Sequence, residues 1–216
     1  MSPSTSTTSR IAAADRLNVQ ELQASLAKTF IGCRIIVLES TRSTNDFLGQ
    51  MLSPELPEGF VVFAEHQTAG RGQRANRWES AAQQGLWFSV LLRPQIPLAE
   101  TACLTDWAAA AVATTIRQEL ALTPTTKPPN DVYLGGRKVC GVLVETKAGR
   151  GPNFAAIVGI GLNVNQSLEA FPVELQTRAG SLAMALGRAV DRQDFAVALL
   201  RELDRSYVEL RRAKKI

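Results

Sequence analysis

The sequence of 216 residues predicts an α+β fold with a mixed, mostly antiparallel β-sheet that is flanked by helices. Segments with strand character alternate irregularly with amphipathic segments, without the strict strand-helix repetition of parallel α/β proteins. Three of these strands follow one another with only turns between them, which is typical of an antiparallel meander. Hydrophobic residues make up 45% of the chain, which is enough for one sizeable core.

The N-terminal end combines a polar tail with a short helix. Residues 1–15 begin with "MSPSTSTTSR", a composition rich in Ser and Thr that is typical of a disordered tail and, less often, of an organelle transit segment. Residues 16–216 are predicted to form a single domain. Its first helix spans residues 18–30, with Asn18 as the capping residue and apolar side chains near helical spacing. One such helix leaves no room for a helix-turn-helix module, so we expect no DNA partner.

The next elements build the first half of the sheet. A buried strand is predicted at 34–39, a helix at 43–52 and a second strand at 59–65. A third strand covers 85–94 and ends at a proline. The polar loop between the second and third strands therefore connects two strands of one sheet.

The second half contains a long helix, the meander and two closing helices. The helix spans 101–120, and strands at 131–134 and 137–147 are separated by a Gly-Gly pair that is typical of a tight hairpin. A turn at 149–152 leads into a strand at 153–165. Helices at 179–187 and 194–212 complete the domain, and we expect the helices to cover one side of the sheet.

Composition narrows the class of protein. Lys and Arg total 24 and Asp and Glu total 20, so the net charge of +4 does not by itself indicate a nucleic-acid or membrane partner. No apolar run approaches the roughly 20 residues of a membrane span, and no secretory signal is recognisable. Cys33, Cys103 and Cys140 stand singly in apolar surroundings and are predicted to be reduced core residues. These features predict a cytoplasmic protein, and the single histidine, His66, offers no catalytic triad.

Glycines alternate with apolar residues in the strand "GIGLNVN". The two-residue period places Ile160, Leu162 and Val164 on one face and Gly159, Gly161, Asn163 and Asn165 on the other. Interior glycines weaken a strand, so this pattern indicates that something approaches the second face closely. A ligand and a tightly packed helix are the two alternatives. Gly141 in the preceding strand leaves a similar gap, so two adjacent strands are predicted to form the floor of a pocket.

Charged and amide side chains lie near this floor. In "KPPND" the prolines hold Lys127 and Asn130 in extended geometry beside Asp131, although the same residues are common in ordinary turns. Lys138 opens an apolar strand, so its ammonium group must either reach solvent or meet an anion. The chain has neither the glycine-rich phosphate loop that ends in Lys-Ser/Thr nor a Rossmann fingerprint.

The segment "GRGQRANRW" at residues 70–78 concentrates cations on flexible backbone and ends in an aromatic ring. Such a loop suits a nucleic-acid backbone, a purely solvated surface, or a compact anion that Arg71, Arg74 and Arg77 surround while Trp78 stacks on a base.

Four motifs taken in order decide between these alternatives: "STN", "AEHQTAGRGQRANRW", "KPPNDVYLGGRKVCGVLVE" and "GIGLNVN". Together they closely resemble the catalytic core of biotin protein ligases, from about residue 32 to about residue 210. The resemblance implies an enzyme that activates biotin with ATP and Mg²⁺, forms biotinyl-AMP, and transfers biotin to a lysine of a biotin carboxyl carrier protein. It also implies that residues 16–216 are one catalytic domain.

The resemblance further implies roles for individual residues. Lys138, Arg71 and Asp131 would be the catalytic residues, and Asp131 would also help to place Mg²⁺. The implied biotin site comprises Ser43, Thr44, Asn45, Gln67, Gly70, Arg71, Gly72, Gln73, Lys138, Gly141, Gly159 and Gly161. The implied site for ATP and the adenylate comprises Arg71, Arg74, Trp78, Lys127, Asn130, Asp131, Lys138 and Asn163.

The chain departs from the family pattern in several places. Gln73 stands where the family usually has arginine, Ala75 where it has glycine and Asn76 where it has arginine, which bears on retention of the adenylate. Pro128 replaces a usual tryptophan. The small C-terminal β-barrel common in the family is not expected, and a homodimer is possible. The alternatives are a lipoate or octanoyl transferase of the same fold and a biotin-binding protein without turnover.

Overall fold

The structure, a computed structural model, describes residues 15–148 and 154–214. Within these ranges seven strands form one sheet in the order β1-β2-β3-β7-β6-β5-β4. The β1–β2 pair is parallel and the other pairs are antiparallel, which confirms the predicted mixed, mostly antiparallel sheet. The strands are β1 Ile35–Leu38, β2 Val61–Ala64, β3 Gly85–Leu92, β4 Thr125–Lys127, β5 Asp131–Leu134, β6 Arg137–Ala148 and β7 Phe154–Asn163.

The connections between strands follow the prediction closely. β2 and β3 are antiparallel neighbours, so the arginine-rich loop joins two adjacent strands. β5, β6 and β7 form the predicted meander, with Gly135 and Gly136 at positive φ values of 54° and 78° in the hairpin. The predicted turn at 149–152 and all but the last residue of the predicted tail at 1–15 lie outside the described residues. β4 was not predicted, because its three exposed residues Thr-Thr-Lys show no apolar alternation.

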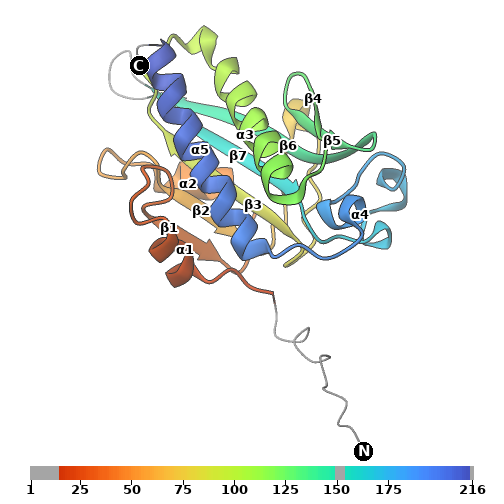
Figure 1. The fold of residues 1–216 in the computed structure, drawn as a ribbon. Coiled ribbons are helices and arrows are strands. Elements are labelled where there is room, and N and C mark those ends of the chain that lie inside the picture. Colours follow the sequence, from red (N-terminus) through yellow and green to blue (C-terminus); the bar gives the residue numbers. More distant parts are fainter. Residues whose placement is uncertain (1–14, 149–153, 215–216) are drawn as a thin grey trace, which may run out of the picture.

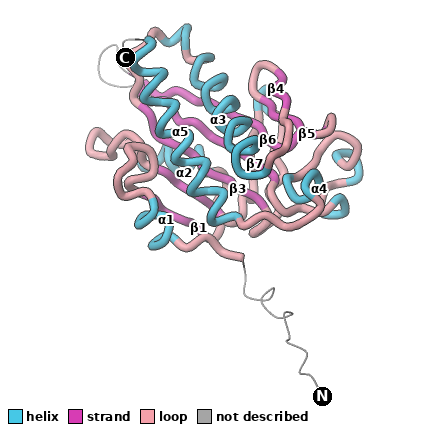
Figure 2. The backbone as a smooth tube through the Cα atoms, viewed as in Figure 1, coloured by secondary structure: helices cyan, strands magenta, loops and turns pink. Residues whose placement is uncertain are grey.

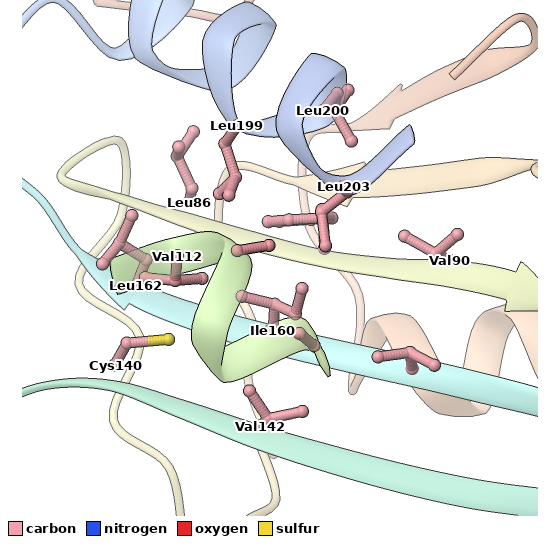
Figure 3. Close-up of a cluster of buried hydrophobic side chains, with 14 of the residues drawn as sticks. Leu86, Val90, Val112, Cys140, Val142, Ile160, Leu162, Leu199, Leu200 and Leu203 are labelled. Atoms are coloured by element: carbon pink, nitrogen blue, oxygen red, sulfur yellow. The ribbon is translucent and has the colours of Figure 1, made fainter. Parts of the chain in front are cut away.

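The main core lies between one face of the sheet and two long helices. Helices α3 (Ala102–Leu120) and α5 (Arg192–Lys214) run side by side across this face (Figures 1 and 2). Figure 3 shows Val112 of α3 and Leu199 and Leu203 of α5 in one buried cluster with Leu86 of β3 and Ile160 of β7. The remaining helices are α1 Val19–Ser25, α2 Thr44–Met51 and α4 Leu182–Leu186.

Helix α2 lies on the opposite face of the sheet, so the expectation that the helices cover one side is wrong. Leu48 of α2 forms a separate buried cluster with Val62, Leu91 and Ile157, whereas Val61 on the same strand as Val62 faces the main core. The strands β2, β3 and β7 carry apolar residues on both faces, since α3 and α5 cover one face and α2 covers the other. Beyond α2, the ring of Trp78 covers this second face at Gly141 of β6 and Gly161 of β7.

The first helix is shorter than predicted. It ends at Ser25, and the Thr29 hydroxyl donates to the carbonyl oxygens of Leu26 and Ile31 in the turn that follows. The backbone amides of Phe30 and Ile31 donate to an Asp204 carboxylate oxygen on α5, each at 2.8 Å. Hydrogen bonds to α5 and within the following turn therefore take the place of the last turn of the predicted helix.

The cysteines do not share one environment. Cys140 is buried and Cys103 is half-buried, as expected for core residues, but Cys33 is exposed. It follows Gly32, whose φ of +88° lies in the left-handed region, in the turn that precedes β1. None of the helices in the described ranges combines the length and the apolar character needed to cross a membrane.

Candidate functional site

The predicted pocket floor is present on the second face of the sheet. Gly141 of β6 pairs directly with Gly161 of β7, while Ile160 and Leu162 point into the main core. A Cβ atom on Gly161 would lie 2.6 Å from the Trp78 ring, and one on Gly141 would lie 2.9 Å from it. No side chain can be accommodated at either position without moving Trp78, so the absence of side chains is a requirement of this arrangement.

Gly159 meets a helix instead. A Cβ atom there would lie 2.4 Å from Asn45 Oδ1, and Asn45 belongs to the first turn of α2. Of the two alternatives considered for the alternating glycines, the packed helix is therefore present at Gly159, and a ligand on this strand stays a prediction. A helix fills the space at Gly159, and an aromatic side chain of the loop covers Gly161.

A polar network closes one end of the floor. The Thr44 amide and hydroxyl donate to Gln67 Oε1 at 2.8 and 3.2 Å, and Gln67 Nε2 donates to Ser80 Oγ at 3.1 Å. Ser89 Oγ lies 2.7 Å from Thr44 Oγ1 and 2.6 Å from Asn45 Oδ1. The sequence analysis missed Ser89, although a polar residue within the apolar strand β3 was the available signal. These groups can recognise a small polar ligand through hydrogen bonds.

The arginine-rich loop folds back on itself as it leaves this network. The Gly72 amide donates to Asn76 O at 2.7 Å, and the Trp78 amide donates to Gly70 O at 2.9 Å. Arg74 occupies the tip with a φ of +57°, in the left-handed region. Trp78 then packs edge-on against Trp87, with ring centroids 6.2 Å apart. The loop thus places the Trp78 ring on the glycine floor.

Arg71 is engaged by two carboxylates. It donates two hydrogen bonds to Glu145 at 2.9 and 2.8 Å and one to Asp46 at 2.5 Å. Glu145 lies on β6 and Asp46 on α2, so this one guanidinium connects the loop to two other elements. Neither carboxylate was identified from the sequence.

Lys138 meets an anion, which settles the question left open by the sequence. Its ammonium nitrogen lies 2.6 Å from Asp131 Oδ1 and 5.3 Å from the centre of the Trp78 ring. Tyr133 stands on the same side of β5 as Asp131, and burial, followed by the nearby Asp131 carboxylate, raises the pKa of its phenol. The side chain of Lys138 remains 30% exposed, so it can reach a ligand that enters from the surface.

Two adjoining cavities surround these residues. The smaller, of about 40 Å³, is too small in this arrangement for more than water, and the larger, of about 580 Å³, is open to the surface. Trp78 and Lys138 line both of them and stand between them. The predicted site residues that line the smaller cavity are Ser43, Thr44, Asn45, Gln67, Arg71, Gly72, Trp78, Asn130, Lys138, Gly141, Gly159 and Gly161.

The larger cavity contains other predicted residues together with some that sequence reasoning missed. Asp131 and Asn163 lie in its wall with Trp78 and Lys138. Arg178 and Phe171 were not identified because they come from segments that showed no recognisable motif, and Tyr133 lies within a recognised motif but was assigned no role. Arg77 lines this cavity, but its guanidinium pairs with Glu79 at 3.0 Å.

Four predicted site residues line neither cavity: Gly70, Gln73, Arg74 and Lys127. Gly70 is buried behind the network, where a Cβ atom would lie 2.6 Å from Trp78 O. Arg74 is exposed at the tip of the loop. Lys127 lies on β4, with its ammonium nitrogen 5.9 Å from the centre of the Tyr133 ring. The binding roles of these four residues stay predictions.

The two asparagines of the predicted nucleotide site, Asn130 and Asn163, have structural partners. Asn130 Nδ2 donates to Val142 O at 2.9 Å, and Asn163 Nδ2 donates to Gly180 O at 2.9 Å. Each side-chain amide has further donor and acceptor positions that a ligand could use. The observed hydrogen bonds, however, hold neighbouring segments beside the floor. Within the described ranges no group of three or more His, Cys, Asp or Glu side chains could hold a metal ion.

Comparison with known proteins agrees with this geometry. The sequence profile described as "Biotin/lipoate A/B protein ligase family" matches residues 37–163, a span that runs from β1 to the end of β7. The chain belongs to this family. All strands of the sheet, the arginine-rich loop and the glycine floor fall within or beside the matched span.

Individual relatives of this family are similar over most of the chain. The "Bifunctional ligase/repressor BirA" of Bacillus subtilis is 37% identical over 82% of this chain and 54% of its own length. The "Biotin--[acetyl-CoA-carboxylase] ligase" of Mycobacterium tuberculosis is 34% identical over 92% of this chain and 75% of its own length. The chain spans about half the length of the first curated relatives it matches.

Solved structures show the same fold. The biotin protein ligase from Aquifex aeolicus in complex with biotin and ATP has a TM-score of 0.70 and 30% identity, covering 82% of this chain and 71% of that one. The biotin protein ligase from Leishmania major in complex with biotinyl-5-AMP has a TM-score of 0.64 and 25% identity, over 81% and 75% of the two chains.

Proposed function

We propose that this protein is an ATP-dependent biotin protein ligase. It forms biotinyl-5'-AMP and pyrophosphate from biotin and ATP, and then transfers the biotinyl group to the amine of a lysine of a biotin carboxyl carrier protein, with release of AMP. The names of the curated relatives and the ligands of the similar crystal structures support this assignment. The carrier protein would be a subunit or domain of acetyl-CoA carboxylase, by analogy with the substrate named for the mycobacterial relative.

The observation that carries the proposal is the arrangement of the two cavities around Lys138. A flat, side-chain-free floor and a polar network fit a ligand with a hydrogen-bonding head and an apolar body. The larger, surface-open cavity fits a nucleotide. Lys138 lies at the junction of the two, where a ligand carboxylate and the α-phosphate of ATP would meet.

Each group then has a task in the first step. Thr44, Asn45 and Gln67 would hydrogen-bond the ureido head, and Gly141 and Gly161 would accept the chain that leads to the carboxylate. Because Trp78 now lies on this part of the floor, it must move aside when the ligand binds. It would then cover the adenine and keep water from the reactive anhydride.

Lys138 would supply the electrostatic part of catalysis. Its ammonium group can hold the attacking carboxylate oxygen and offset the charge that grows on the α-phosphate, an effect worth several kcal/mol in a dry site. Alignment of the two reactants can lower the barrier by about 7 to 11 kcal/mol. The ion pair with Asp131 at 2.6 Å holds the lysine near the junction before substrates arrive.

The nucleotide would enter as its magnesium complex. Mg²⁺ is commonly held by one or two carboxylates together with phosphate oxygens and water, so a single carboxylate from Asp131 is sufficient. A cytoplasmic location and a homodimer stay predictions from the sequence.

The test is transfer of biotin to a carrier domain. The protein is incubated with ATP, Mg²⁺, biotin and a biotin carrier domain, and the mass of the carrier is measured. We expect a mass gain equal to one biotinyl group, and a loss of at least about a hundredfold in rate for Lys138→Ala, as for removal of other preorganised electrostatic groups. Lys147→Ala, at the distant end of β6, serves as the control and should retain the wild-type rate.

Two results would contradict the proposal. Labelling of a lipoyl domain by lipoate, without labelling by biotin, would assign the protein to the lipoate branch of the family. Tight binding of biotin without labelling of any carrier would identify a binding protein without turnover.

A further inference from the structure

The arginine-rich loop is tied to the rest of the molecule through the side chain of Arg71. Its guanidinium donates to Asp46 on α2 and, through two hydrogen bonds, to Glu145 on β6. Arg74 is exposed at the loop tip, and Arg77 pairs with Glu79, its near neighbour in sequence. Arg71 therefore differs from the other loop arginines, because its partners come from two distant elements.

The three hydrogen bonds leave Arg71 little freedom to bind a substrate anion. A guanidinium group has five N–H donors, and three of them are occupied here by protein carboxylates. A substrate carboxylate could recruit this group fully only by displacing Asp46 or Glu145. The geometry thus favours a role for Arg71 as an anchor of the loop.

Glu145 also connects this anchor to the polar end of the pocket. Its Oε2 atom accepts from Arg71 Nη2 and from Asn45 Nδ2, both at 2.8 Å. Asn45 in turn packs against Gly159 on the floor. One carboxylate is therefore shared between the loop and a residue that lines the smaller cavity.

We propose that Asp46 and Glu145 are positioning residues that hold the loop over the pocket through Arg71, and that they control how long the acyl adenylate is retained. This inference rests on the proposed function. The side chains of Arg71, Asp46 and Glu145 are 41%, 39% and 26% exposed, so the ion pairs are partly screened by solvent. Such pairs are weak enough for the loop to open when the carrier lysine must enter.

The substitution Asp46→Asn tests this role directly. It keeps the shape of the side chain and removes its charge, and it acts on a carboxylate that accepts a hydrogen bond from Arg71. We expect amide hydrogen exchange of residues 70–78 in the ligand-free protein to become about fivefold faster, which is the order expected for loss of one partly exposed ion pair. Release of biotinyl-AMP, followed after rapid removal of free substrates, should accelerate by a similar factor.

A matched control is available on α5. Arg205 is also held by two carboxylates, Glu202 and Glu209, far from the loop in the fold. Glu209→Gln removes one of them in the same way, and it should change neither the exchange of the loop nor the release rate. Asp46→Glu restores the charge and should recover slow release in part.

A double substitution distinguishes positioning from general stability. Because Asp46 acts through Arg71, adding Asp46→Asn to Arg71→Ala should produce no further acceleration of release. Additive effects in this pair would overturn the proposal, as would unchanged loop exchange in both Asp46→Asn and Glu145→Gln. If the protein forms no biotinyl-AMP, the proposed function fails, but the exchange measurement still decides whether the two carboxylates hold the loop.

Discussion

At the scale of single residues, the site depends on positions where a side chain is missing. The alternation of glycines in β7 predicted a bare surface, and this surface is present beside the polar network of Thr44 and Gln67. The sequence could not say what approaches the glycines, because Trp78 and Asn45 come from distant segments. Similarly, the sequence left open whether Lys138 reaches solvent or an anion, and its partner Asp131 became visible only in the fold.

We predict that Gly161→Ala weakens biotin binding. The added methyl group would lie 2.6 Å from the present position of the Trp78 ring and would occupy the floor on which the ligand is proposed to lie. Overpacking of this kind typically costs about 1 to 3 kcal/mol, which corresponds to roughly a fivefold to hundredfold rise in the dissociation constant. Titration calorimetry with biotin, without nucleotide, measures this change.

The same substitution at Gly49 is the control. A Cβ atom there would make ordinary contacts of 3.5 Å with Ile157 and Lys147, and the residue lies in helix α2, where alanine is favoured over glycine. Gly49→Ala should therefore bind biotin as the wild type does. Equal affinity for biotin in Gly161→Ala and the wild type would show that the ligand does not use this part of the floor.

At the scale of elements, residues 176–180, which form neither a helix nor a strand, shape one wall of the larger cavity. The Lys138 amide donates to Arg178 O at 2.7 Å, and the Gly180 amide donates to Lys138 O at 2.9 Å. Arg137 donates to Gln176 O and to Ala179 O, the latter at 3.1 Å. The wall that contains Arg178 is thus fastened to β6 on either side of Lys138.

We predict that Arg137→Ala raises the KM for ATP about tenfold and changes the KM for biotin much less. The substitution removes hydrogen bonds from a charged donor to two carbonyl oxygens, each of which typically contributes about 1.5 to 3 kcal/mol. The wall of the proposed nucleotide cavity would loosen, whereas the glycine floor would keep its contacts. Initial rates at varied ATP and varied biotin separate the two constants.

Arg117→Ala on helix α3 provides the control for this experiment. The Arg117 side chain is exposed and donates to Thr114 within its own helix, so its removal should leave both constants unchanged. A parallel rise of both KM values in Arg137→Ala would indicate a general loss of structure and would count against a specific role for the wall.

The elements themselves were predictable to different degrees. The long helix α3 and the meander β5–β7 have strong periodic or turn signals, and both were predicted correctly. The end of α1 and the strand β4 were not, because they depend on hydrogen bonds that Asp204 accepts and on pairing with β5. Local sequence carries no information about such partners.

At the scale of the whole molecule, one buried ion pair joins three parts of the chain. The guanidinium of Arg192, at the start of α5, donates to Glu65 Oε2 at 2.9 and 2.7 Å, with side-chain exposures of 0% and 5%. The other oxygen of Glu65 accepts from the Leu17 amide at 2.7 Å. Glu65 follows β2 and precedes the loop that carries Gln67, so this pair braces the entrance to the site.

We predict that Glu65→Gln lowers the free energy of unfolding by about 3 to 5 kcal/mol, because it leaves the buried Arg192 charge with only the more distant and half-exposed Asp15 carboxylate, 3.5 Å from Nε. Chemical denaturation followed by circular dichroism measures this value. Glu39→Gln, which removes the partner of the exposed Arg16, should have little measurable effect. A loss for Glu65→Gln no larger than that for Glu39→Gln would show that the buried pair does not brace the fold.

The fold class, the order of most elements, the side-chain-free strand face and the resemblance to a ligase family were predictable from residue patterns, because periodicity, turn residues and ordered motifs are local properties. Three features required the folded molecule: α2 covers the second face, Trp78 lies on the glycines, and Asp46 and Glu145 hold Arg71. These contacts join residues far apart in the chain, and their energies arise only when packing brings the elements together.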